Sequence, residues 1–256
     1  MAALDSLKIY SPELLQGKVA LVTGGSNGGM IKEIAKAFLL HGCSQVVLMS
    51  RKLEKLQVHA ADLDKLAPSG SCIAMQGDVR NYDSCENVVK EVVRRFGRID
   101  ILLNGAAGNF LASAEKLSTN GFKTVMEIDT VGTFNMSKAV FVNSMKANKS
   151  GNIINISAEL HWNGTALQAH SSAAKAGVDA LTKVLAVEWG PYGIRVNGLV
   201  PGPIAGTEGL ERLGNLSLMN NKEATKNASA NKATSGGDNS MTLNTMPIPM
   251  LRMGEV

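Results

Sequence analysis

A glycine-rich turn near the amino terminus is the clearest place for chemistry in this sequence. Between an apolar run at 19–23 and a second apolar stretch stands a turn made of Gly24, Gly25, Ser26, Asn27, Gly28 and Gly29. Glycines tolerate positive φ angles and allow close approach, and a helix amino terminus carries partial positive charge. A strand, such a turn and a helix, in this order, predict a pyrophosphate site of a bound dinucleotide. An ordinary connecting turn is the alternative.

Basic residues follow the second predicted strand. Arg51 and Lys52 stand where a site for NAD would usually offer a carboxylate to the ribose hydroxyls. A basic residue there favours a ribose 2′-phosphate, so we expect NADPH as cofactor. The alternative is that both residues form a solvated helix start.

A second pair of candidate residues lies farther along the chain. Ser171 and Lys175 are four positions apart in a predicted helix, so they lie one turn apart on the same face. A serine hydroxyl is far less acidic than a phenol. Ordinary ketone reduction needs an acid beside the developing alkoxide, and Ser171 does not supply one directly.

The composition limits the class of protein. The 256 residues, 45% of them hydrophobic, suit one large domain. The net charge of +4 is small and evenly spread, so we expect no nucleic-acid partner. We also expect no membrane partner, because no apolar stretch reaches the length of a bilayer span. Cys43, Cys72 and Cys85 have no paired spacing, which favours buried thiols in a reducing compartment.

The elements that position these residues alternate along the chain. We expect strands at 19–23, 46–50, 72–76, 99–104, 152–157 and 194–200, and helices at about 30–40, 53–66, 82–96, 122–145 and 171–189. Near-continuous hydrophobicity predicts strands that are buried on both faces. The fold class is therefore α/β, a Rossmann-like doubly wound parallel sheet flanked by helices, with ligands beyond the carboxyl ends of its strands. A polar segment at about 213–246 is interpreted as a flap or insertion on the substrate side.

Several motifs together resemble the short-chain dehydrogenase/reductase family, from about 17 to 252. They are the glycine turn, Gly77-Asp78-Val79, Asn104-Gly105-Ala106-Ala107-Gly108, Lys175 and Pro201-Gly202-Pro203-Ile204. The resemblance implies a single domain, 1–256. It also implies that the protein forms a homo-oligomer, a tetramer by family resemblance. It also implies that the cofactor is bound by the glycine turn and by Arg51, Asp78, Val79, Asn104, Ala106, Lys175, Pro201, Gly202, Pro203, Ile204 and Thr207.

The chain departs from the general family pattern at three catalytic positions. Ser171 stands in place of the tyrosine, Ala158 in place of a serine, and Asp129 in place of a helix asparagine. One branch, the peroxisomal 2,4-dienoyl-CoA reductases, is similar in lacking the tyrosine. It also resembles the chain in Gly105-Ala106-Ala107-Gly108-Asn109-Phe110 and Leu185-Ala186-Val187-Glu188-Trp189-Gly190-Pro191.

This closer resemblance implies a function and its residues. The reaction would be the NADPH-dependent reduction of a 2,4-dienoyl-CoA to the 3-enoyl-CoA in β-oxidation of unsaturated fatty acids, with Asp129 and Lys175 orienting a water as proton donor. The acyl-CoA would contact Arg51, Arg80, Phe110, Ser118, Thr119, Asn120 and Arg212. No metal is expected, because no Cys, Asp or Glu partner stands at ligand spacing from His161 or His170.

Two alternatives stay open at this point. One is an atypical short-chain carbonyl reductase with another proton donor. The other is a truncated, non-catalytic NADP-binding protein. Two features motivate it: Met30 replaces the third glycine of the turn, and the end of the sequence predicts a sheet without the final edge strand of the family. The ending Gly254-Glu255-Val256 is not a Ser-Lys-Leu type address, so a peroxisomal location is expected by resemblance, with the cytoplasm as the alternative.

Overall fold

The computed structural model describes residues 10–26, 28–68, 70–162, 164–202 and 204. Its centre is a parallel sheet with the strand order β3-β2-β1-β4-β5-β6. The strands are β1 (Val19–Thr23), β2 (Gln45–Ser50), β3 (Ser71–Gln76), β4 (Ile101–Asn104), β5 (Gly151–Ile156) and β6 (Ile194–Leu199). The order reverses between β1 and β4, which is the place where doubly wound sheets bind ligands. The predicted fold class is confirmed for these residues.

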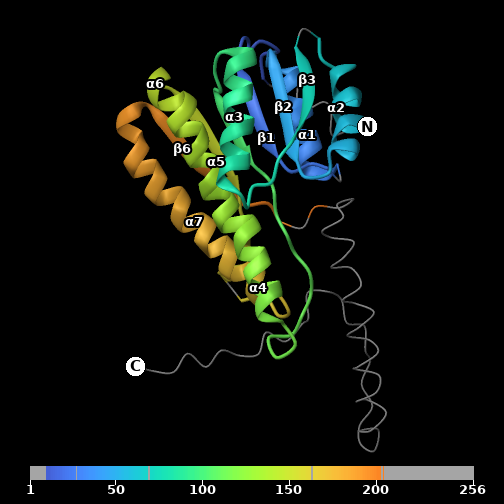
Figure 1. Cartoon of the computed structure of the whole chain (residues 1–256), viewed down its shortest axis with the longest axis vertical. Helices are drawn as coiled ribbons and strands as arrows, with labels where there is room; N and C mark the ends of the chain where they lie inside the picture. Colours follow the sequence, from blue (N-terminus) through green and yellow to red (C-terminus); the bar gives the residue numbers. More distant parts are fainter. Residues whose placement is uncertain (1–9, 27, 69, 163, 203, 205–256) are drawn as a thin grey trace, which may run out of the picture. The chain divides into compact units, whose positions relative to one another are not determined.

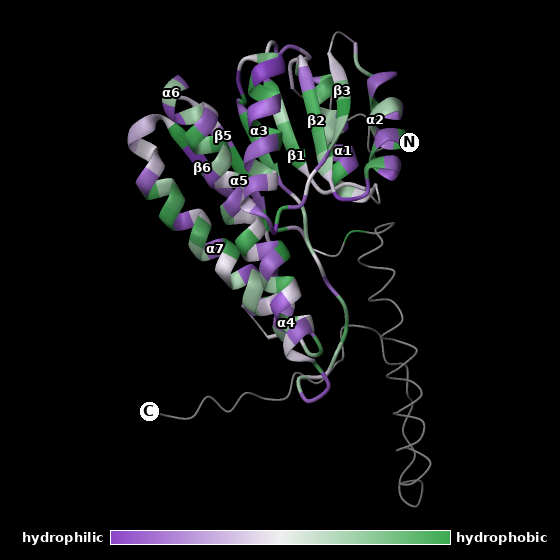
Figure 2. Ribbon diagram, in the orientation of Figure 1, coloured by the Kyte–Doolittle hydropathy of each residue, from purple (hydrophilic) through white to green (hydrophobic). Residues whose placement is uncertain are grey.

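Helices cover the two faces of this sheet (Figure 1). On one side lie α1 (Gly29–Leu40) and α2 (Leu53–Asp64), and on the other lie α3 (Tyr82–Phe96), α5 (Gly132–Val140) and α7 (Ala169–Trp189). Two separate hydrophobic clusters result, one on each face of the sheet. Figure 2 shows the apolar strands β1 and β2 between these helices. The face that a strand residue occupies alternates, so β1 to β5 contribute to both clusters, whereas the buried residues of β6 belong to one of them.

Strand burial follows the prediction in the middle of the sheet and departs from it at β6. Strands β1 and β4 are buried along their whole length. In β6, Arg195 and Asn197 are exposed while Ile194 and Val196 are buried. Among the described residues β6 lies at an edge of the sheet, so only one of its faces packs against a helix, and the prediction of burial on both faces is wrong there.

One long helical stretch carries the middle of the chain. It runs from α4 (Thr119–Met126) through a π-helical turn, η2 (Glu127–Val131), into α5, a second π-helical turn, η3 (Phe141–Met145), and α6 (Lys146–Asn148). Ser118 begins it, because its side chain accepts a hydrogen bond from the Gly121 N–H at 3.0 Å. The sequence predicted this helix at 122–145 without the two widened turns.

The cysteines are buried and unpaired, as predicted. Burial raises the pKa of Cys43 to about 11, and that of Cys72 and Cys85 to about 12. Thiolates are therefore scarce at neutral pH, so these side chains act as small apolar core residues.

Two further observations concern only the part of the chain that the structure describes. None of its helices combines the length and the apolar character that crossing a membrane requires. No cluster of His, Cys, Asp and Glu within these ranges has the arrangement of a metal site. The segment at about 213–246 and the carboxyl end lie outside these residues, so the flap, the single domain and the edge strand stay predictions.

Candidate active site

Asp129 and Lys175 form a buried ion pair beyond the carboxyl ends of the central strands. The Lys175 Nζ atom lies 3.1 Å from the Asp129 Oδ2 atom and donates a hydrogen bond of 3.0 Å to the Ile156 carbonyl at the end of β5. The other carboxylate oxygen, Oδ1, accepts a hydrogen bond of 2.7 Å from the Gly108 N–H. Asp129 is 1% exposed and Lys175 is 7% exposed. The two residues that the sequence paired are therefore in direct contact.

The local helix geometry helps to place Asp129. This residue lies within the π-helical turn η2, where one extra residue widens the helix. Such turns are found mostly at functional sites, because they shift a side chain out of the regular helical position. Lys175 lies on α7, which packs against η2 and α4. The widened turn and the packed helix bring the carboxylate to the ammonium.

Opposing effects act on the pKa of Asp129 in this pair. Burial raises the pKa of Asp129, while the Lys175 ammonium and the hydrogen bond from Gly108 lower it, and burial is the larger effect. The contact with Lys175 is an ion pair and not an aligned hydrogen bond, so Asp129 Oδ2 keeps the capacity to accept one. The pair can therefore hold a water between a charged acceptor and a charged donor.

Other buried polar atoms near this centre lack a hydrogen-bond partner among the described residues. They are Asn104 Oδ1, Asn109 Oδ1, Asp129 Oδ2, Ser157 Oγ and both ring nitrogens of His170. Buried polar atoms in native proteins are nearly always hydrogen-bonded to protein or water. Their gathering at the loops after β4 and β5 marks a place where a bound molecule can satisfy them.

The glycine turn has the backbone geometry that the sequence predicted. Gly24, Gly25, Gly28 and Gly29 all have positive φ angles, from +64° to +91°. A Cβ atom on Gly24 would stand 2.8 Å from the Gly105 carbonyl oxygen, so the turn touches the loop after β4 through backbone alone. Thr23 reinforces this contact, because its Oγ1 accepts hydrogen bonds from Gly105 N–H and Ala106 N–H at 3.1 and 3.2 Å. The turn and the two predicted cofactor residues of the β4 loop, Asn104 and Ala106, are thus side by side.

Asn104 has a structural task as well. Its Nδ2 atom donates to Ser137 Oγ at 3.0 Å and to Asn155 Oδ1 at 2.8 Å, which joins β4, α5 and β5. Met30, the replacement of the third glycine, packs against the cluster on the α1 face. Helix α1 still starts at Gly29, after Gly28 with its positive φ angle. Because Asn27 of the turn lies outside the described residues, the effect of Met30 on cofactor binding stays a prediction.

The predicted cofactor residues Arg51, Asp78 and Val79 and the predicted acyl-CoA residue Arg80 lie at the ends of β2 and β3. Arg51 is exposed after β2, and its carbonyl accepts a hydrogen bond of 3.1 Å from Gln76. Asp78 and Arg80 pair with each other, since Arg80 Nε lies 3.0 Å from both carboxylate oxygens. This pairing holds the pKa of Asp78 below its usual range. Val79 is buried beside Gly132 of α5.

The predicted acyl-CoA residues Phe110, Ser118, Thr119 and Asn120 lie together. The Phe110 ring is 3.0 Å from the position of a Cβ atom on Gly121, in the first turn of α4. Thr119 and Asn120 are exposed in the same turn. Pro201, Gly202 and Ile204 follow β6 at the same end of the sheet. Asn27, Pro203, Thr207 and Arg212 lie outside the described residues, and their roles stay predictions.

Two residues of this region were not among the predicted site residues. His170 is fully buried and its ring stacks on Phe110, and Ser157 is buried at the end of β5. Each is adjacent in sequence to a position that the sequence analysis did single out: His170 to Ser171, and Ser157 to Ala158. Only the structure shows that their polar atoms are enclosed.

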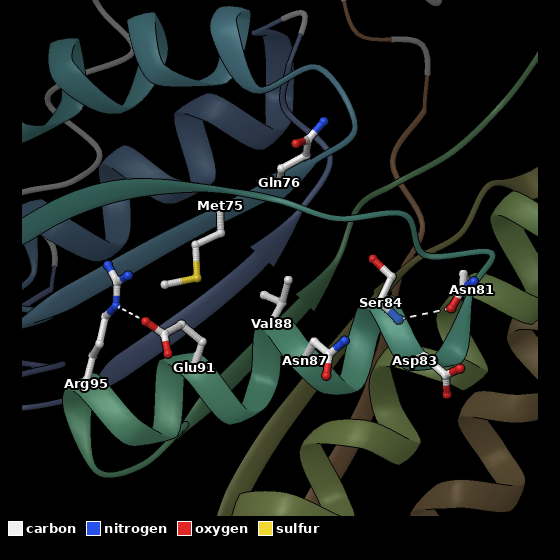
Figure 3. A pocket seen from close by; sticks show the side chains of 9 residues that line it. All are labelled: Met75, Gln76, Asn81, Asp83, Ser84, Asn87, Val88, Glu91 and Arg95. Atoms are coloured by element: carbon white, nitrogen blue, oxygen red, sulfur yellow. Dashed lines mark hydrogen bonds and ion pairs between the residues drawn. The ribbon is translucent and has the colours of Figure 1, made fainter.

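A separate hollow of about 600 Å³ lies along α3 and the end of β3 (Figure 3). It contains none of the predicted site residues. Some of its charged and polar groups already pair: Arg95 contacts Glu91, and the Asn81 side chain accepts a hydrogen bond from Ser84 N–H at 3.0 Å. We therefore place the chemistry at Asp129 and Lys175 and not in this hollow.

These residues fit a phosphorylated dinucleotide. The turn lies so close to the Gly105 backbone that only a glycine fits at position 24. Helix α1 begins at this turn, and Arg51 offers a cation at the end of β2. A doubly wound sheet with this turn is a dinucleotide-binding fold, and the buried pair of Lys175 and Asp129 beyond its strands favours a nucleotide-dependent oxidoreductase.

The comparison with protein families agrees with this class. The family model described as short chain dehydrogenase matches residues 18–215. The chain therefore belongs to the short-chain dehydrogenase/reductase family, whose members that reduce dienoyl-CoA use NADPH.

Relatives of known name are similar over most of the chain. The peroxisomal 2,4-dienoyl-CoA reductase [(3E)-enoyl-CoA-producing] of Danio rerio is 50% identical over 80% of this chain and 67% of its own length. The protein of the same name from Arabidopsis thaliana is 46% identical over 80% of this chain and 70% of its own length.

A solved structure gives the same fold. The citronellol catabolism dehydrogenase of Pseudomonas aeruginosa PAO1 has a TM-score of 0.71 at 34% identity, and the match covers 79% of this chain and 81% of that chain.

Proposed function

We propose that this protein is an NADPH-dependent 2,4-dienoyl-CoA reductase that forms the 3-enoyl-CoA. The observation that carries the proposal is the buried Asp129–Lys175 pair at 3.1 Å, at a site where the proton-donating tyrosine of the wider family is a serine. The relatives with 2,4-dienoyl-CoA reductase in their names support the same activity.

The residues of the chain suit the charge changes of this reaction. Bound NADPH would supply a hydride for the far end of the conjugated dienoyl thioester, which would leave negative charge on the thioester oxygen. The reduced chain then needs one proton on carbon and not on an alkoxide. Asp129 and Lys175 can hold a water and deliver its proton there, because Oδ2 can accept a hydrogen bond and the ammonium stabilises the hydroxide left behind. Ser171 is not required as an acid in this scheme.

The surrounding residues have separate tasks. Lys175 and the glycine turn would hold the cofactor, while Phe110 and the first turn of α4 would contact the acyl-CoA. Arg51 and Arg80 would meet its phosphates, and Arg80 would have to release part of its pairing with Asp78 to do so.

A direct assay tests the function. We expect the loss of NADPH absorbance when a 2,4-dienoyl-CoA is added, with 3-enoyl-CoA as the product by mass spectrometry and chromatography, and a much slower reaction with NADH. A simple ketone is the matched second substrate. Reduction of the ketone without reduction of the dienoyl-CoA would reject the proposal in favour of a carbonyl reductase.

We also infer that the protein is a homo-oligomer, a tetramer by family resemblance, that associates through its long helices. Apolar side chains are exposed on both: Val131, Phe134 and Val142 on the helical stretch of η2 to η3, and Val184 and Val187 on α7. Val187 is 77% exposed. Apolar surface of this kind marks a contact surface for another protein.

Replacing Val187 by glutamate should lower the mass of the assembly. A charge buried between apolar helices is strongly unfavourable, so sedimentation velocity should show the variant shifted toward smaller species. Val58→Glu is the control, because Val58 is 61% exposed on α2, away from these helices. An unchanged mass for Val187→Glu, or an equal shift for both variants, would reject this surface.

The names of the relatives support a cellular location. Those from Danio rerio and Arabidopsis thaliana are called peroxisomal. We propose the same compartment for this protein, which fractionation of the native cells tests.

A further inference from the structure

His170 occupies the junction of two loops that flank the Asp129–Lys175 pair. It lies in the first turn of α7, is 0% exposed, and immediately precedes Ser171. Its ring stacks on that of Phe110 in the loop after β4, with 4.2 Å between the ring centroids and 33° between the planes. Phe110 itself is 38% exposed. The imidazole therefore supports a ring that is still partly open to another molecule.

The same two loops are joined at two further points. Asn109 Nδ2 donates to Gln168 Oε1 at 2.7 Å, and Ala112 N–H donates to the Leu167 carbonyl at 3.0 Å. Leu167 has a φ angle of +65°, a conformation that is unfavourable for a residue with a bulky side chain. Such a conformation persists where surrounding contacts determine it, and this is common at functional sites. The position of His170 is thus fixed by the contacts on both sides.

The ring nitrogens of His170 have few polar groups around them among the described residues. Burial lowers its pKa, while the Phe110 backbone and the Asp129 carboxylate favour the protonated form. The Phe110 backbone comes near the ring, but neither ring nitrogen forms an aligned hydrogen bond within the described residues. The charged groups that bear on this centre are Asp129 from η2 and Lys175 from α7. His170 in turn favours the ionised form of Asp129.

We propose that His170 is a positioning residue of the dienoyl-CoA reductase, which holds Phe110 against the acyl chain and keeps the surroundings of Asp129 polar. This inference rests on the proposed function. The aromatic face and the ring nitrogens have different tasks, so two substitutions separate them. His170→Ala removes both, and His170→Phe keeps an aromatic ring while removing the nitrogens.

The two variants should change different constants. His170→Ala should raise the KM for the dienoyl-CoA about tenfold, because Phe110 loses its support. His170→Phe should keep that KM within about threefold and lower kcat about tenfold. In His170→Phe the acid limb of the kcat profile should also move to higher pH, because a less polar neighbour raises the pKa of Asp129 further.

The experiment measures KM and kcat against pH for the parent and both variants, together with NADPH affinity by fluorescence and octanoyl-CoA affinity by calorimetry. NADPH affinity should stay within about twofold, and octanoyl-CoA should bind about tenfold more weakly to His170→Ala alone. His41→Phe is the control, because His41 is also a buried histidine but contacts Tyr10 and Ser11 at the carboxyl end of α1. It should keep the parent constants.

The outcomes distinguish the two proposals. A parent protein that binds NADPH but does not reduce the dienoyl-CoA rejects the proposed function. A parent that turns over, with a His170→Phe variant of unchanged kcat and pH profile, overturns the role of the ring nitrogens. Equal losses of NADPH and acyl-CoA affinity in both variants would show a merely structural residue. If His170→Ala does not fold, His170→Phe alone decides, since it keeps an aromatic ring at this position.

Discussion

Asp129→Asn should lower kcat for the dienoyl-CoA by about 10² to 10⁴, the range that a positioned proton-transfer group contributes. The amide keeps the shape of the side chain and can still accept the hydrogen bond from Gly108 N–H, but it removes the negative charge beside Lys175. A neutral amide is a weaker acceptor than a carboxylate, so it no longer holds the proton-donating water as firmly beside Lys175. NADPH affinity should change little, because Asp129 does not belong to the predicted cofactor residues.

The pH dependence gives this prediction a second readout. Burial raises the pKa of Asp129, so the ionised carboxylate is lost as pH falls through a value above the usual carboxyl range. In the parent, kcat should therefore decline on the acid side at a higher pH than for an exposed aspartate. That decline should be missing from the residual activity of Asp129→Asn. An acid limb that persists unchanged in the variant would assign it to another group.

Asp179→Asn is the matched control for this substitution. Asp179 lies one turn beyond Lys175 on α7 and contacts His161 Nε2 at 3.1 Å, so it is also a partly buried carboxylate with a nitrogen partner. Its replacement should leave kcat within about twofold, because it does not touch the pair. The water-mediated mechanism would be rejected if Asp129→Asn retained more than about a third of the parent kcat and Asp179→Asn had a similar kcat.

Lys175 and Asp129 should behave as one unit. Lys175→Met and Asp129→Asn each disrupt the ion pair, so the double variant should be little slower than the slower single variant. Comparing the three kcat values in a double-mutant cycle measures this coupling. Independent action, in which the two losses multiply, would mean that the residues serve different steps.

The sequence predicted the strands of the sheet well and the shape of the central helix poorly. Strand β1 lies where the apolar run 19–23 placed it, because burial on both faces leaves a strong pattern. The π-helical turn at Asp129 has no such pattern. Its extra residue is compensated by packing against α7, and a helical period cannot reveal it. The sequence could therefore identify the carboxylate by resemblance, but not explain how it reaches Lys175.

The same limit applies to contacts between loops. The stacking of Phe110 on His170 joins positions that are far apart in the chain, and no local spacing indicates it. The bidentate pairing of Arg80 with Asp78 was equally hidden, although only two positions separate them, because it depends on the direction in which both side chains point. Periodicity reports which face is buried, whereas a site depends on which side chains meet across that face.

The glycine turn supplies the second prediction with a large effect. Gly24→Ala should abolish measurable NADPH binding and lower the melting temperature by roughly 5 to 15 °C, from about 2 to 5 kcal/mol of lost stability. Two causes add. The φ angle of +91° is unfavourable for alanine, and its Cβ atom would stand 2.8 Å from the Gly105 carbonyl oxygen and 2.9 Å from its carbon. Both contact atoms are backbone, so the β4 loop with Asn104 and Ala106 would have to move.

Gly97→Ala separates these two causes, because Gly97 has a similar φ angle of +80° at the end of α3 and no atom within 4 Å of the added Cβ. Only backbone strain changes there, so we expect a loss of about 1 kcal/mol and normal NADPH affinity. Calorimetry and NADPH fluorescence on both variants measure the difference. If both variants were equally destabilised and both still bound NADPH, the close approach of Gly24 to the β4 loop would not shape the cofactor site. If only Gly24→Ala lost NADPH binding, that approach would be tied directly to cofactor affinity.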